Sequence, residues 1–338
     1  MKKRENKMVK KLLCLGIEAT AHTFGVAIVD SDCKILSNVK DTYTTEKGGI
    51  IPVEAAKHHD AVKDKVLNQA LNEAGLSLND IDIIAYSQGP GLAPCLLRGL
   101  YLAKELARKT KKPLVPVNHC IAHLEIGRKL CKCKDPVLLY CSGANTQIIS
   151  YAAGKYRIFG ETLDIGIGNF IDSFARYVGL GFPGGPKIAE LASKSNNLIE
   201  LPYTVKGMDV AFSGLLTNLK QKYDKGFKLE DLAFSLQEYA FAMLIEVSER
   251  AMAHLKKNEL LLGGGVACNK RLQEMASIMC KERGAKAFWP PNDVLVDNAA
   301  MIAWTGILMF KAGQTISPDK ADIKPYERTD DVDVKWLK

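Results

Sequence analysis

Two segments of the chain repeat the same order of predicted elements, and this repetition constrains the fold more than any other feature. Residues 12–45 read as three apolar strands joined by short turns, and residues 136–163 follow the same plan with a turn at Gly154. Each segment is followed by alternating helix and strand patterns, with later strands predicted at 81–89 and 259–265. Strands that alternate with helices are typical of an α/β sheet with helices on its faces. The sequence therefore predicts two copies of one α/β unit.

The length of 338 residues fits this duplication, because it exceeds what one hydrophobic core normally supports. We expect a first lobe over residues 12–130 and a second lobe over residues 131–330, with a ligand-binding cleft between them. The terminal helix, predicted over 297–310, should return toward the first lobe. Residues 1–11 are expected to form a basic arm, and residues 331–338 a tail or linker.

The charge balance favours a polyanionic partner only modestly. The chain has 46 basic and 38 acidic residues, a formal net charge of +8, and part of the excess lies in the arm of residues 1–11. Solvation of that arm and contact with nucleic acid both stay open. The longest apolar run, residues 299–310, is shorter than the ~20 residues of a membrane-spanning helix. Together with nine scattered cysteines, an odd number, these features predict a cytoplasmic protein with free thiols.

Three turns carry the residues that phosphate binding needs. The equivalent turns of the two repeats, residues 16–20 and 142–146, contain small and hydroxyl side chains that leave backbone N–H groups free, although such turns also occur in ordinary hairpins. A third, Gly-rich turn ends at Gly265 and opens a helix at Asn269, where the backbone can approach a nucleotide closely. Together they predict an adenine nucleotide in the cleft, with its phosphates near Gly143 and Glu18 and its base and ribose near Gly265 and Asn269.

The loop Gly179–Gly185 is also Gly-rich, but its spacing and Pro183 argue against a dinucleotide-binding fingerprint. It is better interpreted as a backbone surface beside a ligand, with Asp172, one helix earlier, placed to accept hydrogen bonds from hydroxyl groups. A plain loop is the alternative.

His119 and His123 are the strongest candidates for metal binding. They are spaced i, i+4 on a predicted helix, so both rings project from one face and can bind one ion. Asp297 is the candidate third ligand, although it could instead serve only as the N-cap of the terminal helix. Two histidines and a carboxylate suit iron(II) or zinc, and Tyr140 could add an oxygen ligand. Cys120 follows His119 where a zincin has its Glu, so metallopeptidase chemistry lacks its general base.

The longer motifs are spread from Leu12 to Trp336. They are GIEATAHTFGVAIV, SQGPGLAPCLLRGL, VNHCIAHLEIGR, SGANTQIIS, ETLDIGIGNFIDSFAR, FPGGPK, MDVAFSGLLT and GGGVACNKRL. This set resembles the universal tRNA threonylcarbamoyladenosine synthase family. The resemblance implies the ASKHA fold, two duplicated RNase H-like lobes with an interlobe cleft, as in actin, sugar kinases and heat-shock chaperones. The SGANTQ form and Tyr140 resemble the archaeal and eukaryotic branch, the catalytic subunit of the KEOPS complex, more than bacterial TsaD.

The resemblance also implies an activity and partners. The expected enzyme is an acyltransferase that moves the threonylcarbamoyl group from threonylcarbamoyl-AMP to the tRNA adenosine on the 3′ side of the anticodon. One divalent ion, iron or zinc, would be held by His119, His123, Tyr140 and Asp297, and an ATP site is expected. The implied partners are tRNA, a Bud-type kinase, a small dimerising subunit and a further accessory subunit.

Residue roles follow from the same resemblance. Glu18 stands where relatives of the fold carry an acidic residue in the first phosphate turn, and it is the catalytic candidate that would orient metal or water. The family often has an acid two positions after GGPK, but here Ala189 stands there and Glu190 follows, so no ribose contact is assigned to that position. The substrate- and nucleotide-binding candidates are Tyr140, Cys141, Ser142, Gly143, Ala144, Asp172, Gly185 and Asn269, to which the Gly-rich turn adds Gly265.

Two other classes of function stay open from the sequence. One is an ATP-switched structural or DNA-associated protein of the actin and chaperone kind, and the other is a metallopeptidase. Bound metal distinguishes the first from the acyltransferase, because actin-like switches need no ion coordinated by histidine.

Overall fold

The computed structural model describes residues 11–45 and 48–337. The predicted basic arm therefore lies outside the described residues except for its last member. Lys11 packs its ammonium group 3.1 Å from Asp30 and 2.7 Å from Asp32.

Two sheets of the same topology form the frame of the described chain. The first sheet has the order β3-β2-β1-β4-β5 and the second the order β8-β7-β6-β11-β12. In both, the first three strands are antiparallel neighbours and the last two are parallel additions. The duplicated α/β fold predicted from the sequence is confirmed. The strands are β1 (Leu13–Glu18), β2 (Thr23–Asp30), β3 (Ile35–Thr42), β4 (Ile83–Gly89), β5 (Leu114–Asn118), β6 (Val137–Cys141), β7 (Thr146–Ala152), β8 (Lys155–Glu161), β11 (Glu259–Gly263) and β12 (Lys286–Phe288), with a small hairpin of β9 (Val205–Lys206) and β10 (Asp209–Val210).

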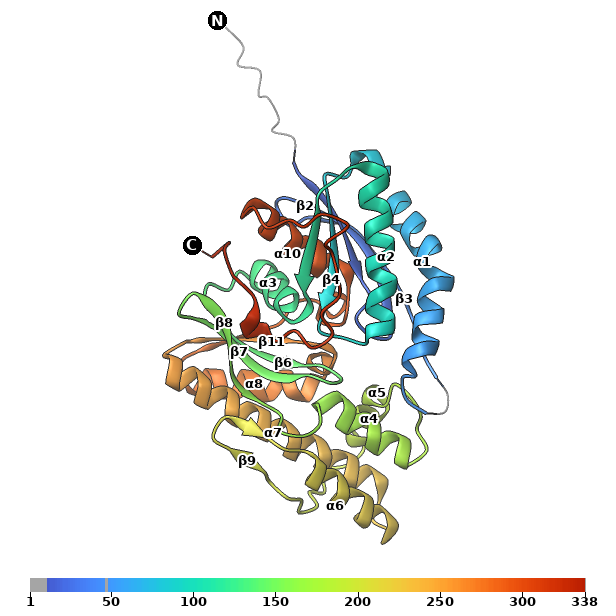
Figure 1. Cartoon of the computed structure of the whole chain (residues 1–338). Helices are drawn as coiled ribbons and strands as arrows, with labels where there is room; N and C mark the ends of the chain where they lie inside the picture. Colours follow the sequence, from blue (N-terminus) through green and yellow to red (C-terminus); the bar gives the residue numbers. More distant parts are fainter. Residues whose placement is uncertain (1–10, 46–47, 338) are drawn as a thin grey trace, which may run out of the picture.

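The first sheet is covered by helices on both faces and forms, with them, the first lobe. Alternate strand residues point to opposite faces, so Leu15 and Ile17 pack against α1 (Pro52–Ala74) and α2 (Ala93–Thr110). Cys14 and Ala85 face the other way, toward α10 (Ala299–Lys311) and α3 (His119–Cys131). The helix predicted near the C-terminus thus packs on the first lobe (Figure 1).

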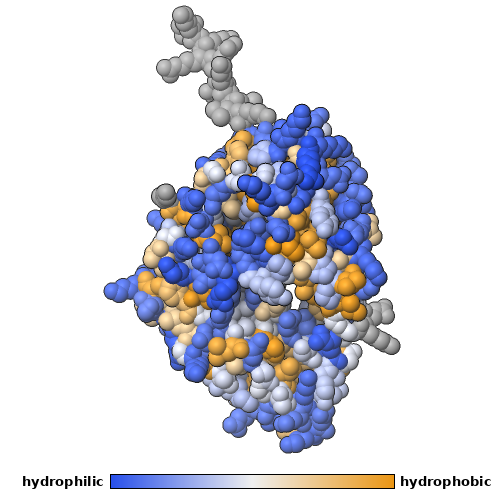
Figure 2. All heavy atoms as spheres, viewed as in Figure 1, coloured by the Kyte–Doolittle hydropathy of each residue, from blue (hydrophilic) through white to orange (hydrophobic). Residues whose placement is uncertain are grey.

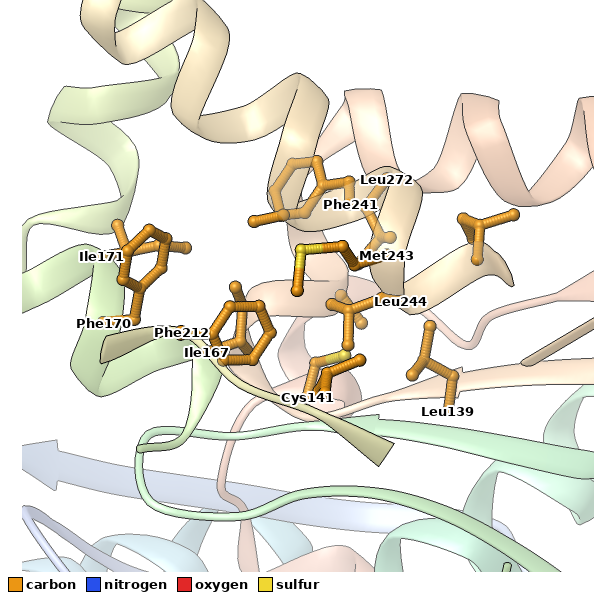
Figure 3. Close-up of a cluster of buried hydrophobic side chains, with 14 of the residues drawn as sticks. Leu139, Cys141, Ile167, Phe170, Ile171, Phe212, Phe241, Met243, Leu244 and Leu272 are labelled. Carbon is orange, nitrogen blue, oxygen red and sulfur yellow. The ribbon is translucent and has the colours of Figure 1, made fainter. Parts of the chain in front are cut away.

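The second sheet packs its larger core against helices that follow it in the chain. Leu139 and Cys141 point toward Phe241, Met243 and Leu244 of the longest helix, α7 (Figure 3). These helices and the second sheet form the second lobe. They are α4 (Ile167–Tyr177), α5 (Gly185–Ala192), α6 (Ser213–Asp224), α7 (Leu229–Leu255) and α8 (Lys270–Glu282), with the short segments η1 (Leu78–Asp80), η2 (Gly265–Cys268), α9 (Asn292–Leu295) and η3 (Thr329–Asp331) completing the described elements.

Helix α3 lies between the two sheets and contributes to both cores (Figure 1). Ala122 and Ile126 belong to the cluster under the first sheet, whereas Ile121 and Leu124 pack with strands of the second. The Cβ position of Gly127 would lie only 2.9 Å from a methyl group of Leu261, so the helix approaches β11 very closely. The lobes therefore meet at a packed helix.

The last described residues pack against α3 at this interface and do not extend away from the protein. Val334 is buried in the same cluster as Ile121 and Leu124, and Trp336 donates a hydrogen bond of 2.6 Å to Glu125 of α3. No helix in the described part combines the length and the apolar character that crossing a membrane requires.

The close approach of β1 to α10 gives a test of the fold. A Cβ atom on Gly16 would lie 2.4 Å from the carbonyl oxygen of Ala299, a backbone atom that cannot move alone. We expect Gly16→Ala to lower the free energy of unfolding by ~1–3 kcal/mol, as overpacked cores do, measured by chemical denaturation. Gly214→Ala is the control, because nothing lies within 4 Å of its Cβ position in α6. Equal stability of both variants would contradict this packing.

Candidate functional site

The two histidines of the predicted ligand pair begin helix α3 directly after strand β5. Asn118 caps the helix, its side-chain oxygen accepting a hydrogen bond of 3.1 Å from the Ile121 backbone N–H. This cap fixes the first turn, so His119 and His123 lie one above the other with ring centroids 4.8 Å apart. Both side chains are buried.

Asp297 reaches these histidines from the segment between α9 and α10. Its Oδ1 lies 3.4 Å from Nε2 of His119 and 3.5 Å from Nε2 of His123. The possibility that Asp297 is merely an N-cap is wrong, because Asn298 caps α10 and accepts a hydrogen bond of 3.1 Å from Met301. The donor atoms of the three residues lie within 4.8 Å of one another, a spacing that suits the binding of one ion.

Tyr140 closes the same cluster from the end of β6. Its ring centroid lies 5.1 Å from that of His123 and 6.4 Å from that of His119. Its hydroxyl group is buried and has no hydrogen-bond partner among the described residues, and Nε2 of His123 has only the 3.5 Å contact with Asp297. Buried polar atoms rarely lack partners. A divalent ion that suits nitrogen and oxygen ligands would satisfy both atoms, so the residues fit such an ion.

Glu18 lies behind His119, on the side away from Asp297. Its Oε2 is 3.0 Å from Nδ1 of His119, while its Oε1 accepts a hydrogen bond of 2.7 Å from the backbone N–H of Thr20. Burial would lower the pKa of His119, but the carboxylates of Glu18 and Asp297 outweigh it and hold that pKa well above its ordinary value. Glu18 thereby fixes which ring nitrogen of His119 faces Asp297, as carboxylates behind metal-binding histidines do.

A cleft of about 1630 Å³ opens between the lobes, where Figure 2 shows this face of the molecule hollowed. Asp297 and His119 form part of its wall, so the ligand cluster borders the cleft directly. Among the sequence-predicted binding residues, those that line the cleft are Tyr140, Ser142, Gly143, Ala144, Asp172, Gly185, Gly265 and Asn269.

Three predicted residues do not line the cleft. The side chain of Cys141 lies in the second-lobe core, because successive strand residues point to opposite faces and Tyr140 takes the cleft-facing position. Only the backbone of Cys141 could meet a ligand. Glu18 and His123 are fully or almost fully buried behind His119 and Asp297, where they can hold other groups but are shielded from the cleft.

The turn Ser142–Asn145 is held tightly against the start of α4. Ser142 donates its backbone N–H to the Asn145 carbonyl at 2.8 Å, and Asn169 donates to the Gly143 carbonyl at 2.9 Å. The Gly-rich turn after β11 packs beside it, since Gly264 has φ +89° and its Cβ would lie 2.4 Å from the Cys141 carbonyl oxygen. Only glycine tolerates both conditions. The two turns form one rigid backbone wall of the cleft.

The loop that ends in Gly185 also borders the cleft. Asp172 accepts a hydrogen bond of 2.7 Å from the Gly184 backbone N–H, and burial raises the pKa of its carboxyl group. Ala189 lines the cleft, but Glu190 does not and pairs with Lys194 at 2.8 Å on the surface.

Several cleft residues escaped the sequence reasoning. His22, Gly91 and Pro325 line the first-lobe side, and Arg271 lines the second-lobe side in a two-pronged pair with Glu238 at 2.7 and 2.8 Å. The pairing of Glu238 with Arg271 cannot be predicted from sequence spacing, because the two residues come from different helices, α7 and α8. His22 could have been predicted from the sequence, since it stands two residues after the first phosphate turn.

Structural comparison confirms the fold alone. HypF of T. kodakarensis aligns with a TM-score of 0.62 at 14% identity, over 89% of this chain and 48% of that one. The (R)-2-hydroxyglutaryl-CoA dehydratase component A of Acidaminococcus fermentans aligns with a TM-score of 0.57 at 12% identity, over 88% and 98% of the two chains.

Sequence comparison is more specific. A protein named tRNA N6-adenosine threonylcarbamoyltransferase from Thermococcus sibiricus is 56% identical over 96% of this chain and all of its own length. A "probable bifunctional tRNA threonylcarbamoyladenosine biosynthesis protein" from Methanocaldococcus jannaschii is 52% identical over 97% of this chain, which spans 61% of that protein. The family model described as TsaD, tRNA N6-adenosine threonylcarbamoyltransferase, matches residues 34–304. The chain belongs to the tRNA N6-adenosine threonylcarbamoyltransferase family.

Proposed function

We propose that this protein transfers the threonylcarbamoyl group from threonylcarbamoyl-AMP to the exocyclic amine of the adenosine on the 3′ side of the tRNA anticodon. Membership of the family supports the reaction. The single structural observation that carries it is the shared wall of the cleft, where the ligand cluster around Asp297 adjoins the two rigid Gly-rich turns. One ligand can therefore touch both.

The proposed reaction needs no covalent intermediate with the protein. The adenosine amine attacks the carbonyl carbon of the mixed anhydride, the bond from that carbon to the phosphate oxygen breaks, AMP leaves with the electron pair and the amine loses one proton. Because AMP is a good leaving group, the main tasks are to position the amine and to stabilise charge on the carbonyl oxygen. A deep cleft with a rigid backbone wall suits both tasks.

The proposed ligands of a divalent ion are His119, His123, Asp297 and Tyr140, and the ion is iron or zinc. When bound, it supplies Lewis-acid polarisation of an acyl oxygen or a grip on the threonyl group. Glu18 is a positioning residue in this proposal, because it touches His119 and not the cleft. It would hold the His119 ring in place and leave Nε2 free as the ligand.

The proposed adenylate and ATP site lies along the second-lobe wall. Backbone N–H groups of the turn at Gly143 would face the phosphates, and the turn from Gly265 to Asn269 would face the base and ribose. The side chain of Asn269 is fixed beside this site by two hydrogen bonds. Its Nδ2 donates one of 2.5 Å to Gln237, and its Oδ1 accepts one of 2.8 Å from the Arg271 backbone N–H. Asp172 would accept from a ligand hydroxyl group.

The proposed partners are tRNA, a Bud-type kinase, a small dimerising subunit and a further accessory subunit, assembled in the cytoplasm as a KEOPS-type complex. A net charge of +8 is modest for a protein that must hold a polyanion alone. Partner subunits would supply the remaining attraction.

A metallopeptidase is disfavoured by the position of Glu18. A general base must reach a water molecule beside the substrate, but both Glu18 oxygens are occupied, one by His119 and one by Thr20. A purely structural ATP switch is disfavoured by the buried ligand cluster, which such a switch does not require.

The first test is metal content. We expect His119→Ala combined with His123→Ala to remove bound iron or zinc, because the remaining ligands cannot hold the ion. Elemental analysis of freshly purified protein measures this, and His254→Ala, at an exposed position of α7, should keep the metal. Stoichiometric metal in the double variant would place the site elsewhere.

The second test concerns the nucleotide. Asn269→Phe should weaken ATP binding by about tenfold or more, equivalent to ~1.4 kcal/mol, because the ring would fill the cleft. Calorimetric titration measures the affinity, and Asn269→Ser, which keeps a helix cap and leaves the space open, should bind ATP nearly as the wild type does. Equal affinities of the Phe variant and the wild type would refute the placement.

The third test is the reaction. In the reconstituted complex supplied with threonylcarbamoyl-AMP, Asp297→Ala should reduce threonylcarbamoyladenosine formation by about 10- to 100-fold, as loss of a residue around a metal site does. Mass analysis of tRNA nucleosides measures the product. Asp293→Ala, an exposed acid of α9, is the matched control. If the Asp297 variant works as fast as the wild type, the metal-centred mechanism is wrong.

A further inference from the structure

The segment between residues 321 and 329 alternates strictly between inward and outward side chains. Pro325 lines the cleft, Glu327 turns inward and Thr329 is buried, whereas Asp322, Lys324, Tyr326 and Arg328 point outward. The side chain of Tyr326 is 93% exposed, and no other large apolar or aromatic side chain in the described residues exceeds 57%. From residue 324 to residue 328 the outward face is therefore a cation, an aromatic ring and a second cation in a row, which we name the Lys324–Arg328 stripe.

The backbone beneath this stripe is fixed on both sides of Tyr326. Lys324 donates its N–H to the Gln88 carbonyl at 2.8 Å, and the Pro325 carbonyl accepts from Gly91 at 3.1 Å. The Glu327 carboxylate then accepts a hydrogen bond of 3.0 Å from the Asn118 side chain. Because the backbone is already fixed, binding would have to restrict only the two side-chain torsions of Tyr326.

The anchors also place the stripe beside the reaction site. Gly91 and Pro325 both line the cleft, and Asn118 caps the helix that begins with His119. In Figure 1 the dark-red C-terminal segment crosses in front of both lobes near α3. A substrate that enters the cleft from this side would pass the stripe.

We propose that the Lys324–Arg328 stripe binds the substrate RNA, with a base next to the target adenosine stacked on Tyr326 and the backbone phosphates near the two cations. This inference rests on the proposed function and names a new contact for it. An enzyme that acts on a base amine takes the base out of its stack. The neighbouring base then exposes a face, and aromatic side chains among cations are the usual partners of such faces.

The charges favour RNA over a protein partner. Lys324 is paired with Glu327 at 2.9 Å, and Arg328 with Glu161 at 3.1 Å and with Asp330 at 3.3 Å. Both cations are about half exposed or more, so these pairs can exchange for phosphate at little cost. The Glu327 carboxylate, which would repel phosphate, is buried beneath the stripe.

The test compares Tyr326→Ala, Tyr326→Phe and Tyr326→Trp in the complete complex with a synthetic anticodon stem-loop as probe. The Ala variant should raise the KM for this RNA by about 5- to 100-fold with kcat nearly unchanged, since one stacked base is lost. Phe and Trp should restore the KM. In a second measurement 2-aminopurine replaces each base that flanks the target adenosine, and its quenching on binding should be lost only with Ala. Tyr203→Ala, an exposed tyrosine of the second lobe, is the control.

The salt dependence of RNA affinity gives an independent test of the proposed phosphate contacts. Lys324→Ala should reduce the slope of log affinity against log salt by about one phosphate contact. An unchanged KM and unchanged quenching in Tyr326→Ala would overturn the proposal. The proposal would also be overturned if size exclusion showed that Tyr326→Ala impairs subunit assembly, while the complex that does form binds RNA normally. If the wild-type complex binds the stem-loop through Tyr326 but forms no product, the proposed function fails while this contact stands.

Discussion

The packing of α3 between the two sheets is the constraint on which the rest of the structure depends. One side of the helix completes the core of the first lobe and the other side completes that of the second, so the helix cannot shift without opening both. Its first residue, His119, follows β5 without a loop, and the Asn118 cap fixes the direction in which the helix starts. The proposed metal ligands thus stand on the most restrained element between the lobes, which suits a site that needs accurate geometry.

The buried charges of the cluster are consistent with that restraint. Burying a carboxylate costs several kcal/mol unless partners compensate it, and Asp297 has two histidines within 3.5 Å. These imidazoles hold the pKa of Asp297 well below its usual range, although burial acts in the opposite direction. Glu18 has His119 and Thr20. The hydroxyl group of Tyr140 has no hydrogen-bond partner among the described residues, and the Tyr140 ring centroid lies 5.1 Å from that of His123.

The sequence was sufficient for features with a short period and insufficient for those built across the chain. The i, i+4 spacing of His119 and His123 needs only helix geometry, and the repeated strand plan needs only alternation. The same alternation, applied to the end of β6, would have predicted that the side chains of Tyr140 and Cys141 point to opposite faces of the sheet, so that only one of them faces the cleft. Choosing Asn298 over Asp297 as the cap required the backbone, because both residue types cap helices well. Pro325 and Arg271 reach the cleft through tertiary packing, for which local spacing holds no signal.

The duplication explains why the cluster lies where it does. The first strand of each repeat, β1 and β6, ends at the interlobe helix, so each lobe delivers one side chain to the same place. The repeats then differ in what they deliver: β1 ends in Glu18, which contacts His119 from behind, whereas β6 brings Tyr140, whose ring lies beside the two histidines. The helix that joins the repeats provides the histidines, and the segment before the last long helix provides Asp297. Neither lobe contains the site by itself. A relative displacement of the lobes would separate Glu18 from Tyr140. The segment of residues 321–337 opposes that displacement, because it is bonded to β4 and β5 of the first lobe and, through Arg328, to Glu161 of β8 in the second lobe.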